Sequence, residues 1–222
     1  MRAATGAKLN GLYLVADLSL PEQKLGKAVE NAVRGGVQIV QIWNVAKAGE
    51  QSTFKICDRI SSVVDKACVP LIVHNDLDLA KRIGADGVHF DECYTSANDA
   101  RKVLGRDAIV GYTCRNNQEM VRKAESSGAD YISFCAVFPS PSVDSCEIVP
   151  LESIHQAKLG VSIPVFASGG ITLENAHLVM EAGADGLAIA SSILSAEDPE
   201  AKARAFRQTI DKYLTARTGA SY

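Results

Sequence analysis

The sequence predicts an α/β protein: a closed parallel (β/α)8 barrel of the TIM type, built as a single domain. Three observations predict it. The chain has 222 residues, and α/β barrels commonly form one domain of about 200–250 residues. Short apolar runs alternate with helical patterns, and a three-residue joint, Gly-Ala-Asp, recurs between them. We expect one domain over residues 1–222, with the barrel units at about 12–216.

The Gly-Ala-Asp joint marks the places where a helix ends and a strand begins. It occurs at residues 84–86, 128–130 and 183–185. Each copy follows a helical pattern, so its glycine falls where a helix C-terminus favours a left-handed residue. Each copy precedes a short apolar run that is typical of a buried parallel strand. Extending this pattern predicts eight strands, at residues 12–16, 37–43, 71–75, 87–90, 109–113, 131–134, 164–168 and 186–190.

Eight evenly spaced strand–helix units favour closure into a barrel over an open sheet. The alternative is a doubly wound sheet, which would carry a G-x-G-x-x-G motif after the first strand. That motif is missing there. No segment has the composition of a linker, so we expect no second domain.

The composition excludes several classes of function. A hydrophobic fraction of 47% with 22% charged residues is typical of a globular protein. A net charge of −3 with dispersed Lys and Arg argues against a nucleic-acid partner. No window approaches the ~20 apolar residues of a membrane span, and residues 1–10 lack a signal core, so we expect a cytoplasmic protein with no membrane partner. The six cysteines show no C-x-x-C spacing and are expected to be reduced.

The ends of the last two predicted strands indicate a phosphate site. In barrels of this fold the active site lies at the carboxyl ends of the strands. Here strand seven is followed by Gly169 and Gly170, and strand eight by Ser191 and Ser192. Two glycines let backbone N–H groups approach an oxyanion, and a helix that begins after strand eight adds positive dipole. The alternative is a tight turn followed by a serine N-cap.

Asn75 and Asp76 close the third predicted strand with an amide and a carboxylate. Such a pair suits Mg²⁺, which proteins hold through one or two carboxylates, water and substrate phosphates. Asp76 also directly precedes a helical pattern, so the alternative is a helix N-cap.

Several segments occur together in a fixed order and spacing. They are Gln41 after an apolar strand, Asn75-Asp76 followed by Leu79-Ala80, the run from Gly84 to His89, Phe138-Pro139 with Ser140 and Ser142, Gly169-Gly170-Ile171, and the run from Gly183 to Gly186. In this order the chain resembles thiamine-phosphate synthase and its TenI-like relatives, over roughly residues 12–210. It is identified as a divergent member of that family.

The resemblance implies a transferase of thiamine biosynthesis. Such an enzyme joins a hydroxymethylpyrimidine diphosphate to a thiazole phosphate, with Mg²⁺ and basic side chains neutralising the departing diphosphate. The resemblance assigns catalysis to Gln41, Asn75, Thr113, Arg115, Ser140 and Ser142. It places Mg²⁺ at Asp76, with Glu92 beside the position of the family's second carboxylate.

The chain departs from the family pattern mainly at charged positions. The family's Gln-x-Arg-x-Lys motif after strand two reads Gln41, Trp43 and Val45 here. Tyr94 stands at the second magnesium carboxylate, and Val143 at the lysine of the sixth loop. A departing diphosphate needs cationic stabilisation in the transition state. We therefore expect impaired synthase activity.

The rim of the predicted barrel carries one arginine and three aromatic residues of interest. TenI-like tautomerases use a histidine after strand five, which aligns with Arg115. Arg115 is either a displaced phosphate clamp or a solvated side chain. Trp43, Tyr94 and Tyr112 are candidates to line the substrate pocket and stack on a flat heterocycle, with packing between barrel and helices as the alternative for Tyr112.

Cys93, Cys114 and Cys135 recur at intervals of 21 residues near the ends of adjacent predicted strands. We expect these thiols to approach one another without holding a metal, because the paired spacing of structural zinc sites is missing. His74 and His89 fall within strand patterns, and we expect them to be packed and hydrogen-bonded.

Three functions remain open from the sequence. The first is synthase activity, impaired or kept by rearranged cations. The second is a TenI-like enzyme that acts on a phosphorylated heterocycle without displacing diphosphate, and the third is a non-catalytic binder. The expected partner in each case is a phosphorylated small-molecule heterocycle, and a homo-oligomer is compatible with all three.

Overall fold

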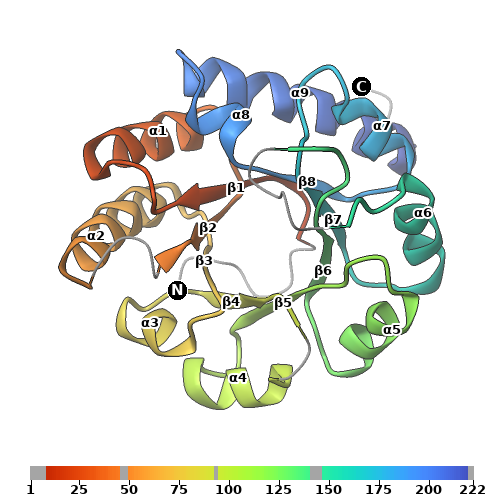
Figure 1. The fold of residues 1–222 in the computed structure, drawn as a ribbon, viewed down its shortest axis with the longest axis horizontal. Coiled ribbons are helices and arrows are strands. Elements are labelled where there is room, and N and C mark those ends of the chain that lie inside the picture. Colours follow the sequence, from red (N-terminus) through yellow and green to blue (C-terminus); the bar gives the residue numbers. More distant parts are fainter. Residues whose placement is uncertain (1–8, 46–49, 93–94, 141–146, 220–222) are drawn as a thin grey trace.

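The computed structural model describes residues 9–45, 50–92, 95–140 and 147–219. Eight parallel strands pair in sequence order, and β8 pairs with β1 to close a barrel (Figure 1). The strands are β1 (Gly11–Asp17), β2 (Ile39–Trp43), β3 (Leu71–His74), β4 (Gly87–Phe90), β5 (Ile109–Thr113), β6 (Tyr131–Phe134), β7 (Val165–Ser168) and β8 (Gly186–Ile189). The predicted fold class is confirmed.

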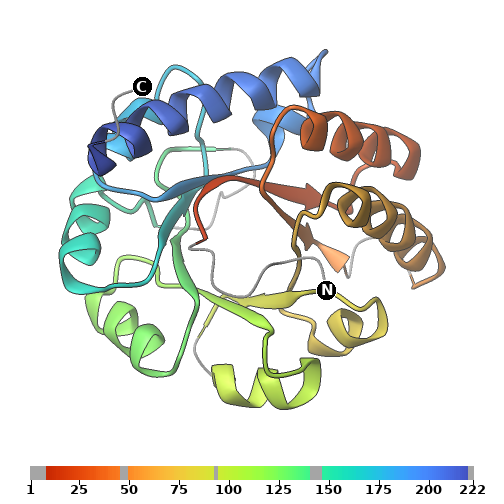
Figure 2. The ribbon, with the colours of Figure 1, turned by 180° about the vertical axis from the view of Figure 1, so that it is seen from behind.

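The helices form a ring outside the strands, as Figures 1 and 2 show from the two ends of the barrel. They are α1 (Glu22–Arg34), α2 (Glu50–Ala67), α3 (Leu77–Arg82), α4 (Ala97–Leu104), α5 (Gln118–Ser126), α6 (Leu151–Gly160), α7 (Ala176–Glu181), α8 (Ser191–Leu194) and α9 (Pro199–Thr218). The long helix α9 packs against α1 and α7 and so covers the place where β8 meets β1. In the described part of the chain, no helix is both long and apolar enough to cross a membrane.

Five strands differ from their predicted bounds by one or two residues: β3 and β8 end earlier, β2 and β7 begin later, and β1 extends by one residue at each end. β3 ends at His74 because Asn75 takes a left-handed conformation, with φ +53°. β8 ends at Ile189 because Ala190 turns the chain into α8. β2 begins at Ile39 because the Val37 amide still bonds back to the end of α1, at the Ala32 carbonyl.

The Gly-Ala-Asp joint has the conformation that the sequence predicts. Its glycine follows the last residue of α3, α5 or α7 by two positions and has a positive φ: +61° at Gly84, +86° at Gly128 and +109° at Gly183. This region of φ favours glycine because it has no Cβ.

The aspartate of each joint accepts a hydrogen bond from the amide at or near the start of the preceding strand. The donors are Leu71 to Asp86 at 2.8 Å, Val110 to Asp130 at 2.7 Å, and Val165 to Asp185 at 2.9 Å. These bonds satisfy backbone donors at the bottom of the barrel, where a buried unpaired N–H would be costly. The repeated motif is therefore a structural joint and lies at the end opposite to the candidate site.

Aromatic side chains fill the lower half of the barrel. Tyr13, Tyr131 and Phe166 are fully buried and meet edge to face, with ring centroids 5.4–6.0 Å apart. Ile39, Ile72 and Ile109 complete this inner core. Any pocket within the barrel must therefore lie above the aromatic rings, at the carboxyl ends of the strands.

Candidate active site

One cavity of about 320 Å³ lies at the carboxyl ends of the strands. All eight strands, or the residues that follow them, contribute to its wall. Its size falls at the lower end of the range for small-molecule sites. The described residues that line it include no lysine or arginine, and their ionisable carboxylate is Asp91.

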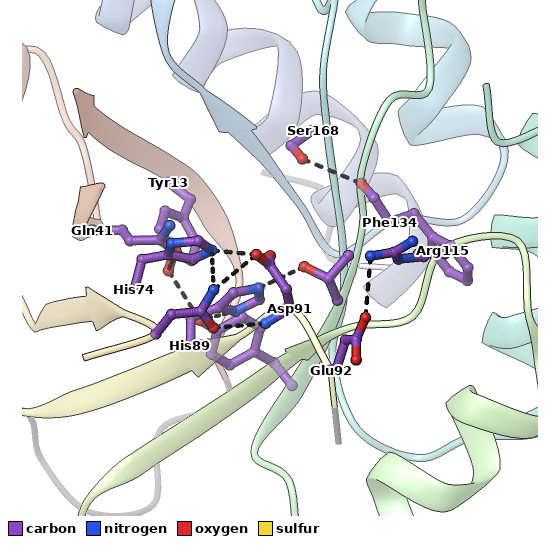
Figure 3. Close-up of polar contacts among 12 residues, drawn as sticks. Tyr13, Gln41, His74, His89, Asp91, Glu92, Arg115, Phe134 and Ser168 are labelled. Atoms are coloured by element: carbon purple, nitrogen blue, oxygen red, sulfur yellow. Dashed lines mark hydrogen bonds and ion pairs between the residues drawn. The ribbon is translucent and has the colours of Figure 1, made fainter. Parts of the chain in front are cut away.

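The floor of the cavity is a continuous chain of polar contacts (Figure 3). The Tyr13 hydroxyl donates to Gln41 Oε1 at 2.6 Å and lies 2.9 Å from the Tyr131 hydroxyl. The Tyr131 hydroxyl lies 2.9 Å from His89 Nδ1, and His89 Nε2 lies 2.9 Å from Thr113 Oγ1. The five residues come from five strands, so the barrel itself assembles the chain.

Burial keeps the members of this chain neutral. Desolvation lowers the pKa of His89 to about 3, and the neighbouring His74 acts in the same direction. Desolvation also raises the pKa of both Tyr13 and Tyr131. At neutral pH, the cavity floor therefore consists of uncharged hydrogen-bonding groups.

A second polar cluster, formed by His74, Asn75 and Asp91, lies beside this floor (Figure 3). The Asp91 carboxylate contacts His74 Nε2 at 2.9 Å and accepts from Asn75 Nδ2 at 2.8 Å, while the Asp91 amide donates to Asn75 Oδ1 at 3.0 Å. Burial alone would raise the pKa of Asp91, but the His74 and Asn75 contacts lower it to about 2. The carboxylate is therefore ionised and held in place.

The neutral state of His89 predicts a loss of stability in acid. Its pKa is lower in the folded chain, about 3 against 6.5, so between these values the unfolded state binds more protons. Stability is complete above pH 6.5 and falls as the pH drops towards 3. Between pH 7 and pH 5 we expect His89 to contribute a loss of about 2 kcal/mol, at 1.36 kcal/mol per unit of pKa. Urea denaturation at pH 7 and at pH 5 measures this difference in the free energy of unfolding.

The matched controls for this experiment are His89→Gln and His155→Gln. The first variant should lose the extra acid sensitivity, whereas the second changes an exposed histidine and should retain it. Equal pH dependence in wild type and His89→Gln would contradict a neutral, buried His89.

The loops after β7 and β8 meet the loop after β6 at one side of the cavity. Gly169 and Gly170 have φ values of +90° and +66°. A Cβ at Gly169 would lie 2.7 Å from the Ala136 backbone, and one at Gly170 would lie 2.5 Å from the Phe138 carbonyl. The Ser192 hydroxyl donates to the Ile171 carbonyl at 2.7 Å and ties the last two loops together.

The structure brings together eight of the residues singled out in the sequence. Each of them lines the cavity: Gln41, Trp43, Thr113, Ser140, Gly169, Gly170, Ser191 and Ser192. Tyr94 and Ser142 lie outside the described residues. The remaining candidates lie at the rim or away from the cavity.

The rim residues have structural partners. Asp76 is the N-cap of α3 and accepts from the Leu79 amide at 2.8 Å, as the alternative interpretation had it. Glu92 pairs with Arg115 at 3.3 Å, and Figure 3 shows this pair to one side of the polar floor. Both side chains reach solvent, with 36% and 66% exposure. Arg115 is therefore positioned over the rim and outside the cavity lining.

Tyr112 is a correction to the predicted pocket. Its ring is fully buried between the barrel and the helices, stacks on Phe90, and donates its hydroxyl hydrogen bond to the Thr95 carbonyl at 2.6 Å. The reason is strand alternation: Thr113 faces inwards, so its neighbour faces outwards. Tyr112 cannot stack on a ligand in the cavity.

Two of the three cysteines singled out in the sequence lie in different surroundings, and whether the thiols approach one another stays a prediction. Cys114 is fully buried in the outer core, whereas Cys135 lines the cavity. Cys93 lies outside the described residues. Across the described chain, no three His, Cys, Asp or Glu side chains are grouped so as to hold a metal ion.

Sequence reasoning missed Tyr13, Tyr131 and Asp91 as parts of the site. Asp91 follows β4 directly, and its position after a strand was the available signal. The two tyrosines lie within strands, where an apolar pattern gives no indication that their hydroxyl groups face a cavity. His74 and His89 are hydrogen-bonded, as expected.

The fold and the cavity define a class of protein: a (β/α)8 barrel with a polar pocket at the carboxyl ends of its strands, the usual place for an active site in this fold. A family profile described as thiamine monophosphate synthase matches residues 12–193. The chain belongs to the thiamine-phosphate synthase family, whose members are transferases of thiamine biosynthesis.

Similar proteins cover nearly the full length of the chain. A thiamine-phosphate synthase of Methanobrevibacter smithii is 37% identical over 189 residues, which are 85% of this chain and 90% of the relative. One of Nitrosococcus oceani is 36% identical over 203 residues, or 91% and 93%. The solved structure of thiamine phosphate pyrophosphorylase from Pyrococcus furiosus superposes with a TM-score of 0.79 at 28% identity, covering 92% of this chain and 96% of that one.

Proposed function

We propose that this enzyme binds a phosphorylated thiazole-like heterocycle in the barrel cavity and that its displacement of diphosphate is weak. One observation carries the proposal. The described lining keeps the glycines and hydroxyl groups of the family pattern, but it contains no lysine or arginine. Backbone N–H and hydroxyl dipoles suffice to hold a phosphate that stays bound. A departing diphosphate develops negative charge in the transition state, and cations are needed to stabilise that charge.

The phosphate of the ligand lies between the Gly169-Gly170 backbone and the Ser191-Ser192 turn. These two segments face the same cavity, and the Ser192 to Ile171 bond fixes their separation. Glycine at both positions leaves the backbone N–H groups uncovered by side chains. The heterocycle extends from there towards Trp43, whose indole also lines the cavity.

Magnesium would be held at the rim. Asp76 uses Oδ1 for its helix cap and Glu92 uses Oε1 for Arg115, so each retains a second carboxylate oxygen. These donors fit Mg²⁺, which is commonly held by one or two carboxylates with water and substrate phosphates completing the shell. When bound, the ion supplies positive charge to the diphosphate. Arg115 stands at the same rim and adds a guanidinium fork suited to phosphate.

A second function is supported by the same lack of lysine and arginine among the described lining residues. An enzyme that acts on a phosphorylated heterocycle without displacing diphosphate would need the phosphate site and the neutral floor only. Turnover of thiazole phosphate in the absence of the pyrimidine diphosphate would distinguish this function from that of the synthase.

The phosphate position is tested by adding a negative charge to it. Ser191→Asp is expected to weaken thiazole phosphate binding at least about tenfold, because a like charge in contact costs more than ~1.4 kcal/mol even at an effective dielectric constant of ~20. Ser195→Asp is the control, since Ser195 is exposed at the other end of α8 and does not line the cavity. Calorimetry measures the affinity of both variants for thiazole phosphate. Equal affinities would place the phosphate elsewhere.

A further inference from the structure

The side chain of Asn175 is turned away from the helix that it precedes. Asn175 is the N-cap residue of α7, where an asparagine oxygen ordinarily accepts from an amide in the first turn of its helix, but here the side chain makes no such bond. Asn117, the N-cap of α5, shows the ordinary arrangement. Its oxygen accepts from the Glu119 and Met120 amides at 2.9 and 3.1 Å. The side-chain amide of Asn175 therefore serves something other than its own helix.

Asn175 bonds instead to the loop that follows β7. Its Oδ1 accepts from the Thr172 amide at 2.8 Å, and its Nδ2 donates to the Gly170 carbonyl at 3.0 Å. A backbone N–H can only donate and a carbonyl can only accept, so the two contacts together fix which end of the side-chain amide faces which partner. Gly170 lines the cavity, whereas Asn175 lies outside the lining. Asn175 therefore acts on the cavity wall through the loop.

The carbonyls on either side of Gly170 are anchored as well. The Gly169 carbonyl accepts from the Phe138 amide at 3.1 Å, and the Ile171 carbonyl accepts from the Ser192 hydroxyl at 2.7 Å. The three donors belong to the loop after β6, the start of α7 and the short helix α8. Three consecutive carbonyls of the loop are therefore held by three separate parts of the chain.

These anchors determine where the N–H groups of the loop point. The described chain contains no cis peptide bond, and in a trans peptide the N–H points opposite to the C=O. The Gly170 N–H therefore points away from Phe138, and the Ile171 N–H points away from Asn175. Among the described residues, neither N–H has a hydrogen-bond partner, and both residues line the cavity. The loop thus has two adjacent N–H groups left for a ligand.

We infer that Asn175 is a positioning residue for an anion: its hold on the Gly170 carbonyl keeps the Ile171 N–H facing the cavity. An anchor is needed because glycine adopts left-handed and right-handed conformations with little difference in energy, so the peptide that follows it rotates readily. Without Asn175, the Gly170 carbonyl can turn towards the cavity and present a partial negative charge to the anion. The inference rests on the proposed binding of phosphate at this loop, whereas the hydrogen bonds of Asn175 do not.

Amide NMR of the wild type tests which N–H groups meet the anion. Thiazole phosphate should move the amide proton signals of Gly170 and Ile171 downfield, because each N–H gains a charged acceptor. The Thr172 signal should stay near its place, since that amide already donates to Asn175. A shift at Thr172 in place of Ile171, or at Gly170 without Ile171, would overturn the inference. With ligand bound, three unchanged signals would contradict the proposed phosphate position instead.

Asn175→Ala tests the positioning role by calorimetry with two ligands, thiazole phosphate and the thiazole alcohol that lacks the phosphate. The variant should bind thiazole phosphate about tenfold to hundredfold more weakly, the value of one hydrogen bond to a charged group. It should bind the alcohol as the wild type does, whereas a general distortion of the cavity would weaken both ligands alike. An unchanged affinity for thiazole phosphate, or an equal loss for both ligands, would overturn the positioning role.

Asn117→Ala is the matched control, because it removes an asparagine from the same helix position. Its side chain caps its own helix, so this variant should lose stability and keep its affinity for thiazole phosphate. Equal losses of that affinity in the two alanine variants would overturn the inference. A wild type that binds thiazole phosphate no more tightly than the alcohol would instead contradict the proposed function. If Asn175→Ala does not fold, the amide signals of the wild type decide.

Discussion

Combining Trp43→Arg with Val45→Lys is expected to raise magnesium-dependent thiamine phosphate formation by about two orders of magnitude or more. Trp43 lines the cavity and Val45 follows it by two residues, at the places where the family pattern has its two cations. One preorganised donor to a developing anion contributes about 2.7–4 kcal/mol to the transition state, or roughly 100-fold to 1000-fold in rate. The effects of the two substitutions on the rate need not add, because cations that bind the same diphosphate act as a unit.

The control for this gain is a variant with Gln at both positions. Glutamine opens the same space and is polar, but it adds no charge. Its turnover should not rise above that of the wild type, and both variants should lose the contact between Trp43 and thiazole phosphate to a similar extent. If the charged variant folds, binds thiazole phosphate and turns over no faster than the glutamine variant, missing cations are not what limits the reaction.

Gly170→Ala is expected to destabilise the chain by about 1–3 kcal/mol more than Gly84→Ala. Both glycines are left-handed, with φ of +66° and +61°, so alanine meets the same backbone strain of about 1–2 kcal/mol at each. They differ in their surroundings. A Cβ at Gly84 meets no atom within 4 Å, whereas one at Gly170 would lie 2.5 Å from the Phe138 carbonyl and 2.6 Å from that of Pro139.

The same pair of variants reports on the site. The clash forces the loops after β6 and β7 apart, and both loops line the cavity, so Gly170→Ala should also weaken thiazole phosphate binding. Gly84→Ala should leave the affinity unchanged, since it lies beyond α3 at the opposite end of the barrel. Thermal denaturation and calorimetry measure the two effects. Equal melting temperatures would mean that the loops can move apart at no cost.

The fold could be predicted from the sequence because its signals are local. The Gly-Ala-Asp joints mark three helix-to-strand junctions, and short apolar runs mark the strands themselves. β4, β5 and β6 have the predicted bounds. The errors at the other five strands concern one or two residues at the strand ends, and at β3 and β8 a left-handed residue or a turn ends the strand.

The site could be predicted only in part, because it depends on which strands lie opposite one another. Gln41 and Thr113 were recognisable from their places at or near strand ends. Tyr13 and Tyr131 are 118 residues apart, and their contact exists only because the closed barrel brings β1 and β6 to the same floor. Tyr112 shows the converse: its place beside Thr113 suggested a rim residue, but alternation along β5 turns it outwards.

The central claim is our proposal that the cavity binds phosphate through its glycine and serine segments, while its described lining lacks the cations that diphosphate displacement needs. The most direct test is the rate of magnesium-dependent thiamine phosphate formation by the wild type, beside the 37% identical synthase of Methanobrevibacter smithii in the same assay. We predict turnover at least about two orders of magnitude below that relative, from the loss of at least one charged contact, with thiazole phosphate still bound. A rate equal to that of the relative would contradict the claim.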